Sequence, residues 1–156
     1  MDMIFSDIVP ADPRMESDVA PLVRVLRPGL SAVAFREFMA EAQGQGLVVT
    51  AVHGPDGGCL GVATHRVLAT SRGRVLFVDD LVTAPEARGR GVGGRLPAEL
   101  ERRGTAARCE RVELDSGVTN HGAHRFYHAG GLAITALHFS RPLPSPVPAP
   151  RSPRRA

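Results

Sequence analysis

Residues 88–94 read Arg-Gly-Arg-Gly-Val-Gly-Gly, and this stretch decides how the rest of the sequence is interpreted. It lies between an apolar run typical of a strand, residues 74–83, and a helical pattern over about residues 92–103. Glycine lets the backbone approach a ligand closely, and the free N–H groups of a helix's first turn attract an anion. Charge-assisted contacts to phosphate oxygens are offered by Arg88, Arg90 and Arg95. The stretch therefore predicts a site for a phosphate-bearing ligand.

Periodicity and turn signals on either side predict a single α/β domain without internal repeats. Strands are expected over residues 3–9, 47–53, 59–68, 74–83, 111–116 and 132–141. Helices are expected over residues 15–26, from the N-cap Ser31 to Gly44, over 92–103 and over 120–129. Pro21 is compatible with the first of these helices only in its first turn.

The composition excludes several classes of enzyme. All 19 basic residues are arginine, so a Schiff-base enzyme, a Walker-type phosphate lysine and a lysine general base are ruled out. A chain of 156 residues fits one domain that can bury a core without the support of disulfides or metal ions. Cys59 and Cys109 are not spaced as a cluster, and they are expected to be reduced thiols of a cytoplasmic protein.

The positive charge is concentrated at the C-terminal end. Residues 141–156 hold four arginines, six prolines and no acid, so removing them changes the net charge from +3 to −1. We expect a catalytic domain over residues 1–141 and a disordered Pro/Arg-rich tail over residues 142–156. A nearly neutral domain does not favour a nucleic-acid partner. No apolar run approaches ~18 residues and the N-terminus lacks a basic leader, so no membrane span is expected.

Two kinds of phosphate-bearing ligand are compatible with the glycine loop. Gly89, Gly91 and Gly94 satisfy G-x-G-x-x-G, and Glu113 or Asp115 follows about 20 residues later, as in dinucleotide-binding enzymes. The first glycine of that fingerprint normally follows its strand directly and opens a βαβ series, which this sequence does not do. An NAD(P)-binding oxidoreductase is therefore the alternative hypothesis.

A second pattern fits the spacing better. Arg88-x-x-Gly91-x-Gly93, preceded by residues 81–86 (Leu-Val-Thr-Ala-Pro-Glu), resembles the R/Q-x-x-G-x-G/A motif of the GCN5-related N-acetyltransferases, or GNAT family. Residues 123–132, Ala-His-Arg-Phe-Tyr-His-Ala-Gly-Gly-Leu, resemble that family's A-x-x-F-Y-x-x-x-G-F segment. The order of elements also matches, so the resemblance covers roughly residues 3–141. It departs from the family at Pro97, within the expected helix, and at Leu132, where phenylalanine is usual.

The resemblance implies a mixed, mostly antiparallel sheet flanked by helices, and acetyl transfer from acetyl-CoA to a small-molecule or peptide amine. Direct attack in a ternary complex is expected, because no cysteine falls in the motifs. A homodimer is compatible with the family, and a non-catalytic acyl-CoA sensor is a further alternative. The implied cofactor-binding residues are Leu81, Val82 and Thr83 through their backbones, Arg88, Gly89, Arg90, Gly91, Val92, Gly93 and Gly94 in the loop, and Asn120, which also suits an N-cap.

Tyr127 is the candidate general acid. It occupies the family's tyrosine position and is the only tyrosine in the chain. A departing thiolate, with a pKa of about 8.5 for its conjugate acid, benefits from a nearby proton donor. The competing interpretation is a core aromatic residue beside Phe126.

The candidate acids that assist deprotonation of the amine are Asp79 and Asp80, which interrupt an apolar strand. An amine with a pKa of about 10.4 is mostly protonated at neutral pH, so some group must accept its proton. Strand alternation sends the two carboxylates to opposite faces unless a bulge, which this strand is expected to carry, intervenes. They could instead hold a cationic acceptor or make structural hydrogen bonds, and Asp115 is a third candidate.

Three histidines of the last helix have i, i+3, i+7 spacing: His121, His124 and His128. No acid or cysteine accompanies them at ligand spacing, so no metal site is expected. One of them could line the acceptor site. The sequence assigns no role to His138.

Overall fold

The computed structural model describes residues 2–144, and its centre is a five-stranded sheet with strand order β1-β2-β3-β4-β5. The strands are β1 Ile4–Asp7, β2 Val48–His53, β3 Cys59–Thr70, β4 Gly73–Thr83 and β5 Arg111–Leu114. Neighbouring strands are antiparallel, except that β5 runs parallel to β4. The four α-helices are α1 Ala20–Leu26, α2 Ala32–Gly44, α3 Val92–Ala106 and α4 His121–Ala129.

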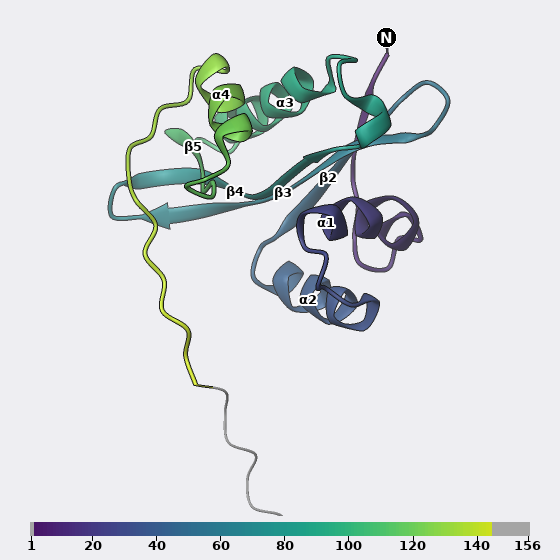
Figure 1. Cartoon of the computed structure of the whole chain (residues 1–156), viewed down its shortest axis with the longest axis horizontal. Coiled ribbons are helices and arrows are strands. Elements are labelled where there is room, and N and C mark those ends of the chain that lie inside the picture. Colours follow the sequence, from purple (N-terminus) through teal and green to yellow (C-terminus); the bar gives the residue numbers. More distant parts are fainter. Residues whose placement is uncertain (1, 145–156) are drawn as a thin grey trace, which may run out of the picture.

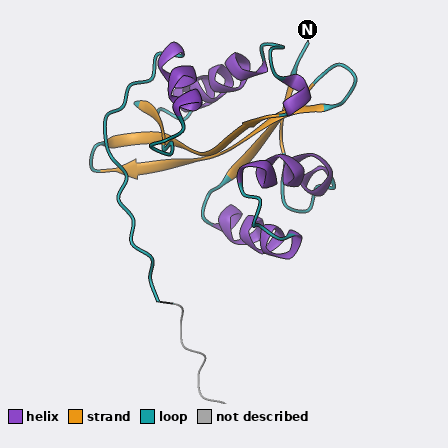
Figure 2. Cartoon of the chain, in the orientation of Figure 1, coloured by secondary structure: helices purple, strands orange, loops and turns teal. Residues whose placement is uncertain are grey.

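The helices form a layer on each face of the sheet (Figure 1). Helices α1 and α2 cover one face, while α3 and α4 cover the other, and Figure 2 shows the strands as the middle layer. This arrangement confirms the predicted α/β fold with a mixed, mostly antiparallel sheet flanked by helices.

The first helical region is divided in two. Residues Met15–Val19 form a π-helical turn, and α1 continues directly from it. Pro21 therefore lies in the first turn of α1, the part of a helix that tolerates proline. Met15, Val19 and Val23 are buried, so the apolar side chains of this region pack on the sheet.

Helix α2 begins where the sequence predicts, and both long helices bury an apolar face. The Ser31 hydroxyl oxygen accepts a hydrogen bond of 3.1 Å from the Ala34 N–H, as expected of an N-cap. Phe35 and Met39 of α2 are fully buried beneath the sheet. The buried face of α3 consists of Val92, Leu96, Leu100 and Gly104.

One predicted element is wrong. Residues 132–141 were expected to form the last strand, but the structure has no strand after β5 within its described residues. The chain leaves α4, passes the ends of β4 and β5, and runs away from the domain in an extended conformation (Figure 1). The residues favour a strand, but a strand also needs a backbone partner, and this segment has none among the described residues.

Two further expectations concern the C-terminal tail and membrane-spanning helices. Most of the tail predicted to be disordered, from residue 145 onward, lies outside the described residues. Among the residues that are described, no helix combines the length and apolar character that crossing a membrane requires.

Candidate active site

The two central strands of the site diverge. Pairing between β4 and β5 runs from Val75 opposite Arg111 to Val78 opposite Leu114 and then ends. Strand β4 continues to Thr83, paired only with β3 on its other edge. Over its last residues β4 therefore presents one edge to which no described strand is bonded.

Alternation along the antiparallel ladder identifies the groups on that edge. The Ala84 N–H donates to the Leu60 carbonyl at 2.9 Å, so residue 84 faces β3. In an antiparallel ladder every second residue faces the same neighbour. The backbone groups of Val82 therefore also face β3, while those of Leu81 and Thr83 face the side that β5 has left. Three residues of β4 were expected to contact the cofactor through their backbones. Two of them, Leu81 and Thr83, have N–H and C=O groups on this unpaired side.

The glycine loop lies where β4 ends. A short 3-10 turn, Pro85–Ala87, follows the strand and buries Ala87 completely. Gly89 and Gly91 then have φ values of +74° and +81°, which side-chain-bearing residues rarely adopt. Gly91 is the N-cap residue of α3, so the left-handed turn directs the chain into the helix.

The start of α3 offers a group of free N–H donors. Among the described residues, no hydrogen-bond acceptor is recorded for the N–H groups of Gly89, Gly91, Val92 or Gly93. Free donors at a helix N-terminus, together with the helix dipole, attract anions. Exposed arginines flank these donors in the loop and the first helical turn: Arg88, Arg90 and Arg95. The geometry is suited to a phosphate group.

Gly93 also brings two helices together. A Cβ atom at this position would lie 3.3 Å from Cε2 of Phe126, tighter than most such contacts. By contrast, a Cβ atom at Gly94 would meet nothing within 4 Å. The glycine at position 93 therefore allows α4 to pack against the start of α3, which brings the helix that carries Tyr127 close to the glycine loop.

Tyr127 is half-buried on α4, and its ring packs edge-on against Phe126 with centroids 5.4 Å apart. Burial raises the pKa of its phenol above the usual value of 10, so the group holds its proton at neutral pH. The hydroxyl makes no hydrogen bond within the described part of the chain. Tyr127 thus combines partial burial with a hydroxyl left available for another partner.

Asn120 caps the same helix. Its side-chain oxygen accepts a hydrogen bond of 3.2 Å from the Ala123 N–H, which confirms the N-cap interpretation. Two glycines, Gly130 and Gly131, follow the C-terminal end of α4. Gly131, at φ +86°, lets the Leu132 N–H reach the Tyr127 carbonyl at 3.0 Å.

The acidic pair lies at a bulge in β4. Thr64 is opposite Asp80 and His65 is opposite Val78, so Asp79 is the extra residue. This confirms the bulge expected from the sequence. Both carboxylates bond to side chains of β3 two positions apart, Thr64 and Arg66, which point to the same face of the sheet. The bulge has therefore placed both acids on one face, the face covered by α1.

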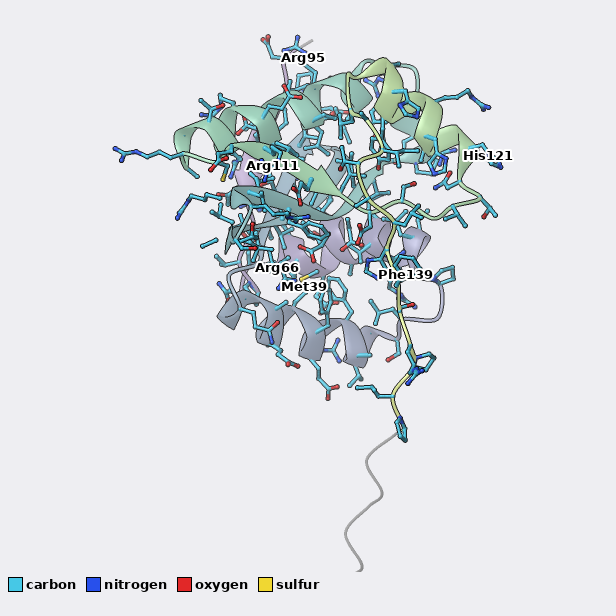
Figure 3. All side chains as sticks on the ribbon, turned by 90° about the vertical axis from the view of Figure 1, so that its left-hand side faces the viewer. Met39, Arg66, Arg95, Arg111, His121 and Phe139 are labelled. Carbon is cyan, nitrogen blue, oxygen red and sulfur yellow. The ribbon has the colours of Figure 1, made fainter. Side chains whose placement is uncertain are left out.

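The two carboxylates have different surroundings. Asp79 is bound through both oxygens by Arg66, with Nε and Nη2 each 3.1 Å away, and Figure 3 labels that arginine. Asp80 accepts one hydrogen bond of 2.7 Å from Thr64, and its other oxygen lies 3.6 Å from Nη2 of Arg27. The sequence did not indicate these three partners, because long-range strand register and the end of α1 bring them to the acids.

Neither Asp115 nor the histidines of α4 bond to Asp79 or Asp80 within the described part of the chain. Asp115 is exposed and makes a 3.0 Å contact with Nδ1 of His138. On α4, His124 bonds to the Gly117 carbonyl at 2.9 Å, and His128 bonds to the Leu132 carbonyl at 3.1 Å. These two histidines thus bond to backbone groups at the two ends of their helix.

A cluster that the sequence did not predict joins the π-helical turn to the β2–β3 hairpin. Asp18, His53 and Cys59 place their potential ligand atoms within 4.8 Å of one another. His53 Nε2 already lies 2.8 Å from a carboxylate oxygen of Asp18. Burial raises the pKa of the Cys59 thiol to about 11, so this side chain keeps its proton. The cluster is a hydrogen-bonded link between elements.

Comparison with known proteins identifies the family to which this geometry belongs. A sequence profile described as "Acetyltransferase (GNAT) family" matches residues 15–131, which is most of the chain. The chain belongs to the GNAT family. It is therefore an acetyltransferase by family, as the two motifs implied. No curated protein matches its sequence.

Solved structures have the same GNAT fold. The aminoglycoside N-acetyltransferase AAC(6')-Iy in complex with CoA is 23% identical, with a TM-score of 0.77 over 90% of this chain and 95% of that one. A Trypanosoma brucei acetyltransferase is 24% identical, with a TM-score of 0.70 over 91% and 100%. An aminoglycoside acetyltransferase from an uncultured soil sample is 14% identical, with a TM-score of 0.73 over 91% and 97%. At these identities the likeness shows the fold alone.

The GNAT fold also bears on the dinucleotide hypothesis. In this chain the 3-10 turn separates the first glycine from its strand, and the only parallel pair in the described sheet is β4 with β5. A dinucleotide fold requires the loop to open a series of parallel βαβ units. The glycine loop therefore does not open such a series, although it satisfies the G-x-G-x-x-G spacing.

Proposed function

We propose that this protein transfers the acetyl group of acetyl-CoA to an amine by direct attack in a ternary complex. The observation that carries the proposal is the end of β4–β5 pairing at Val78, on the strand that leads into the glycine loop and beside the helix of Tyr127. These features lie in the order that an extended acyl-CoA molecule requires, with backbone groups along β4 first and phosphate donors at its end.

Binding of acetyl-CoA relies on two groups of donors. Backbone groups of Leu81 and Thr83 bond to the pantetheine arm, and the free N–H groups at the start of α3 hold the pyrophosphate with Arg88 and Arg95. Asn120, although it caps α4, offers its side-chain nitrogen to the same arm. No metal is needed for any of these contacts.

The acyl transfer itself breaks a C–S bond and forms a C–N bond. The amine nitrogen attacks the thioester carbonyl carbon, and a backbone N–H of the β4 edge stabilises the resulting oxyanion, an effect worth roughly 10²–10³-fold in rate. When the C–S bond breaks, the departing sulfur takes the proton of the Tyr127 hydroxyl. A phenol whose pKa is raised by burial is still protonated at neutral pH and can serve this purpose.

Asp80 is the better candidate for accepting the proton of the amine. Both oxygens of Asp79 are engaged by Arg66, whereas Asp80 has one oxygen that receives no hydrogen bond within the described chain. Its nearest cation, Arg27, is beyond hydrogen-bond distance at 3.6 Å. That oxygen can accept a hydrogen bond from an incoming amine, directly or through water.

The acceptor is proposed to be a small-molecule or peptide amine. The two aspartates are balanced by Arg66 and Arg27, so this face does not form a strongly anionic patch that would select a polycation. AAC(6')-Iy, a structural neighbour, has been solved in complex with the bisubstrate analogue CoA-S-monomethyl-acetylneamine, which makes amino sugars a reasonable first class to test. We place the protein in the cytoplasm, where acetyl-CoA is available.

The test is release of free CoA from acetyl-CoA in the presence of a panel of amines, together with calorimetric binding of acetyl-CoA and NADH. We expect acetyl-CoA to bind, NADH not to bind, and at least one amine to stimulate CoA release. Failure to bind acetyl-CoA would reject the proposal. Binding without release across amino sugars, polyamines, amino acids and peptides would instead support an acyl-CoA sensor.

A further inference from the structure

Three side chains of different chemical types meet where the π-helical turn contacts the β2–β3 hairpin. Asp18, His53 and Cys59 each offer one potential ligand atom, and these oxygen, nitrogen and sulfur atoms lie within 4.8 Å of one another. His53 is buried and the other two are half-buried. The acetyl transfer proposed above uses none of the three. Oxygen, nitrogen and sulfur donors this close together are also the donor set of a transition-metal site.

Both backbone segments that carry these residues depart from regular geometry here. Asp18 lies in the π-helical turn Met15–Val19, in which a helix accommodates an extra residue. In the β2–β3 ladder the register shifts so that His53 pairs directly with Cys59, and Leu60 is the extra residue of a bulge. π-helical turns and bulges are both frequent at functional sites, where they redirect side chains. Two such irregularities bring the three donors together.

The distances suit tetrahedral coordination of Zn²⁺. The ion binds nitrogen and oxygen at about 2.0–2.2 Å and sulfur at about 2.3 Å, so its ligand atoms stand roughly 3.3–3.7 Å apart. Nε2 of His53 and a carboxylate oxygen of Asp18 are 2.8 Å apart, and they need to separate by only about 0.5 Å to admit the ion. Three protein ligands leave the fourth position of the tetrahedron to a water molecule.

Neighbouring side chains orient the carboxylate and reduce the opposing charge. One oxygen of Asp18 faces His53, and the other accepts a hydrogen bond of 2.7 Å from the Ser17 hydroxyl. Such a second hydrogen bond fixes the direction of a metal ligand. The positive charge of Arg14 also reaches Asp18, but Arg14 is bound through two nitrogens by the Asp12 carboxylate, at 3.1 and 2.7 Å. That ion pair neutralises the cation that would otherwise repel a metal.

The Cys59 thiol is protonated without a metal because its surroundings oppose a free thiolate. Burial is the main cause of its raised pKa, about 11, and the negative charges of Asp18 and Glu86 raise it further. The same two acids favour a divalent cation beside the sulfur. A thiol that coordinates a metal releases its proton to solvent, and the thiolate and the Asp18 carboxylate then balance the charge of the ion.

We propose that Asp18, His53 and Cys59 bind one Zn²⁺ ion, which fastens the π-helical turn to the β2–β3 hairpin. A set of thiolate, imidazole and carboxylate suits Zn²⁺, whereas Mg²⁺ and Ca²⁺ prefer oxygen ligands alone. The ion joins segments 35 positions apart in the chain. At the bulge the Leu60 carbonyl accepts the Ala84 N–H at 2.9 Å, so the same link supports the end of β4. Its role is structural, and acetyl transfer does not require it.

The test is a titration of the untagged, reduced full chain with Co²⁺, whose spectrum reports the ligands that Zn²⁺ would meet. One Co²⁺ should bind per chain and give the near-ultraviolet absorption band of a cobalt–thiolate bond, which Zn²⁺ should abolish and excess Mg²⁺ should not. Cys59→Ser should lack the band, while Cys109→Ser, the other half-buried cysteine, should keep it. No Co²⁺ binding, binding without the band, or a band that survives in Cys59→Ser overturns the proposal.

A second variant tests the carboxylate and decides the matter if Cys59→Ser does not fold, as judged by circular dichroism. Asp18→Asn keeps a hydrogen-bonding side chain beside His53 but loses the negative charge, so its Zn²⁺ affinity should fall by at least about 10-fold. The matched control is Asp12→Asn, which removes an acid already bound to Arg14 and should leave the affinity unchanged. Equal affinities of Asp18→Asn and the wild type overturn the proposal.

Thermal unfolding tests the structural role. An ion that binds only the folded state stabilises it, so Zn²⁺ should raise the unfolding midpoint of the wild type and of Cys109→Ser. The midpoint of Cys59→Ser should not respond to Zn²⁺. A wild-type midpoint that Zn²⁺ leaves unchanged, or an equal rise in Cys59→Ser, contradicts the proposed link. None of these measurements depends on acetyl transfer, so their failure would leave the proposed function untouched.

Discussion

Asp79 and Arg66 form a two-point ion pair across the β3–β4 ladder, with two N···O distances of 3.1 Å. The pair forms at the bulge, where Asp79 has no opposite residue on β3. The neighbouring Asp80 keeps one oxygen without a hydrogen bond from the described chain. Two acids that are equivalent in the sequence therefore differ in what they can do, which leads to opposite predictions for the two.

Asp80→Asn should lower kcat by about 10²-fold at neutral pH, because the amine loses its proton acceptor while the amide can still bond to Thr64. Activity should recover as the pH approaches the pKa of the free amine, where the acceptor no longer needs a base. The measurement is the pH dependence of kcat/KM, with Asp79→Asn as the matched control.

Asp79→Asn should instead reduce stability by about 1 kcal/mol and leave turnover within a few-fold of the wild type, since it breaks a partly buried ion pair. Urea unfolding measures the first effect and steady-state kinetics the second. A larger kinetic loss in this variant than in Asp80→Asn would reverse the assignment of the two acids.

Tyr127→Phe should lower kcat by about 10²-fold with little change in the affinity for acetyl-CoA, because it removes the proton donor and keeps the packing against Phe126. Since burial raises the phenol's pKa, wild-type activity should show no loss from tyrosine ionisation below about pH 10. Stopped-flow turnover and calorimetry separate the two parameters. Unchanged turnover would remove Tyr127 as the acid.

Gly91→Ala should weaken acetyl-CoA binding and destabilise the fold by about 1 kcal/mol, because alanine resists the φ of +81° that starts α3. Gly94→Ala is the control in the same loop. It has open space and lies within the helix, so it should be neutral or stabilise by up to about 1 kcal/mol. Equal effects of the two substitutions on thermal unfolding would contradict this account of the loop.

Stability should fall in mild acid because of His65. Its Nε2 lies 3.0 Å from the Thr50 hydroxyl, which itself donates to Asp7, so Nε2 carries a hydrogen and donates it to Thr50. Its Nδ1 is buried without a partner among the described residues. Burial, aided by the positive charge of Arg103, lowers the pKa of His65 to about 4.

The direction of this pH effect follows from the lowered pKa. The unfolded chain, with a histidine pKa of about 6.5, takes up the proton first, so the stabilisation is complete above pH 6.5 and is lost as pH falls toward 4. Between pH 7 and pH 5 we expect a loss of about 2 kcal/mol in urea unfolding. His65→Gln should remove this pH-dependent part, and an unchanged slope would show that another group causes it.

Much of the fold could be predicted because its determinants are local. Residues that begin or end helices act on their immediate neighbours, so the helix ends could be placed within a few residues. Examples are the N-cap Ser31, Pro21 in the first turn of α1, and the glycines at the C-terminal end of α4. The strand over residues 132–141 could not be judged in this way. Its propensity is local, but pairing depends on a strand elsewhere in the fold, and no described strand bonds to this segment.

The sequence by itself determined the family, the glycine loop and the single tyrosine, because each depends on residue type and short spacing. Only the tertiary structure decided the roles of Asp79 and Asp80, since the bulge, the register of β3 and the end of α1 fix which partners each carboxylate meets. It also decided that Gly93 serves helix packing as well as the loop, because Phe126 approaches it from 33 positions further along the chain. Contacts between distant residues depend on how the elements pack, and no short pattern in the sequence encodes them.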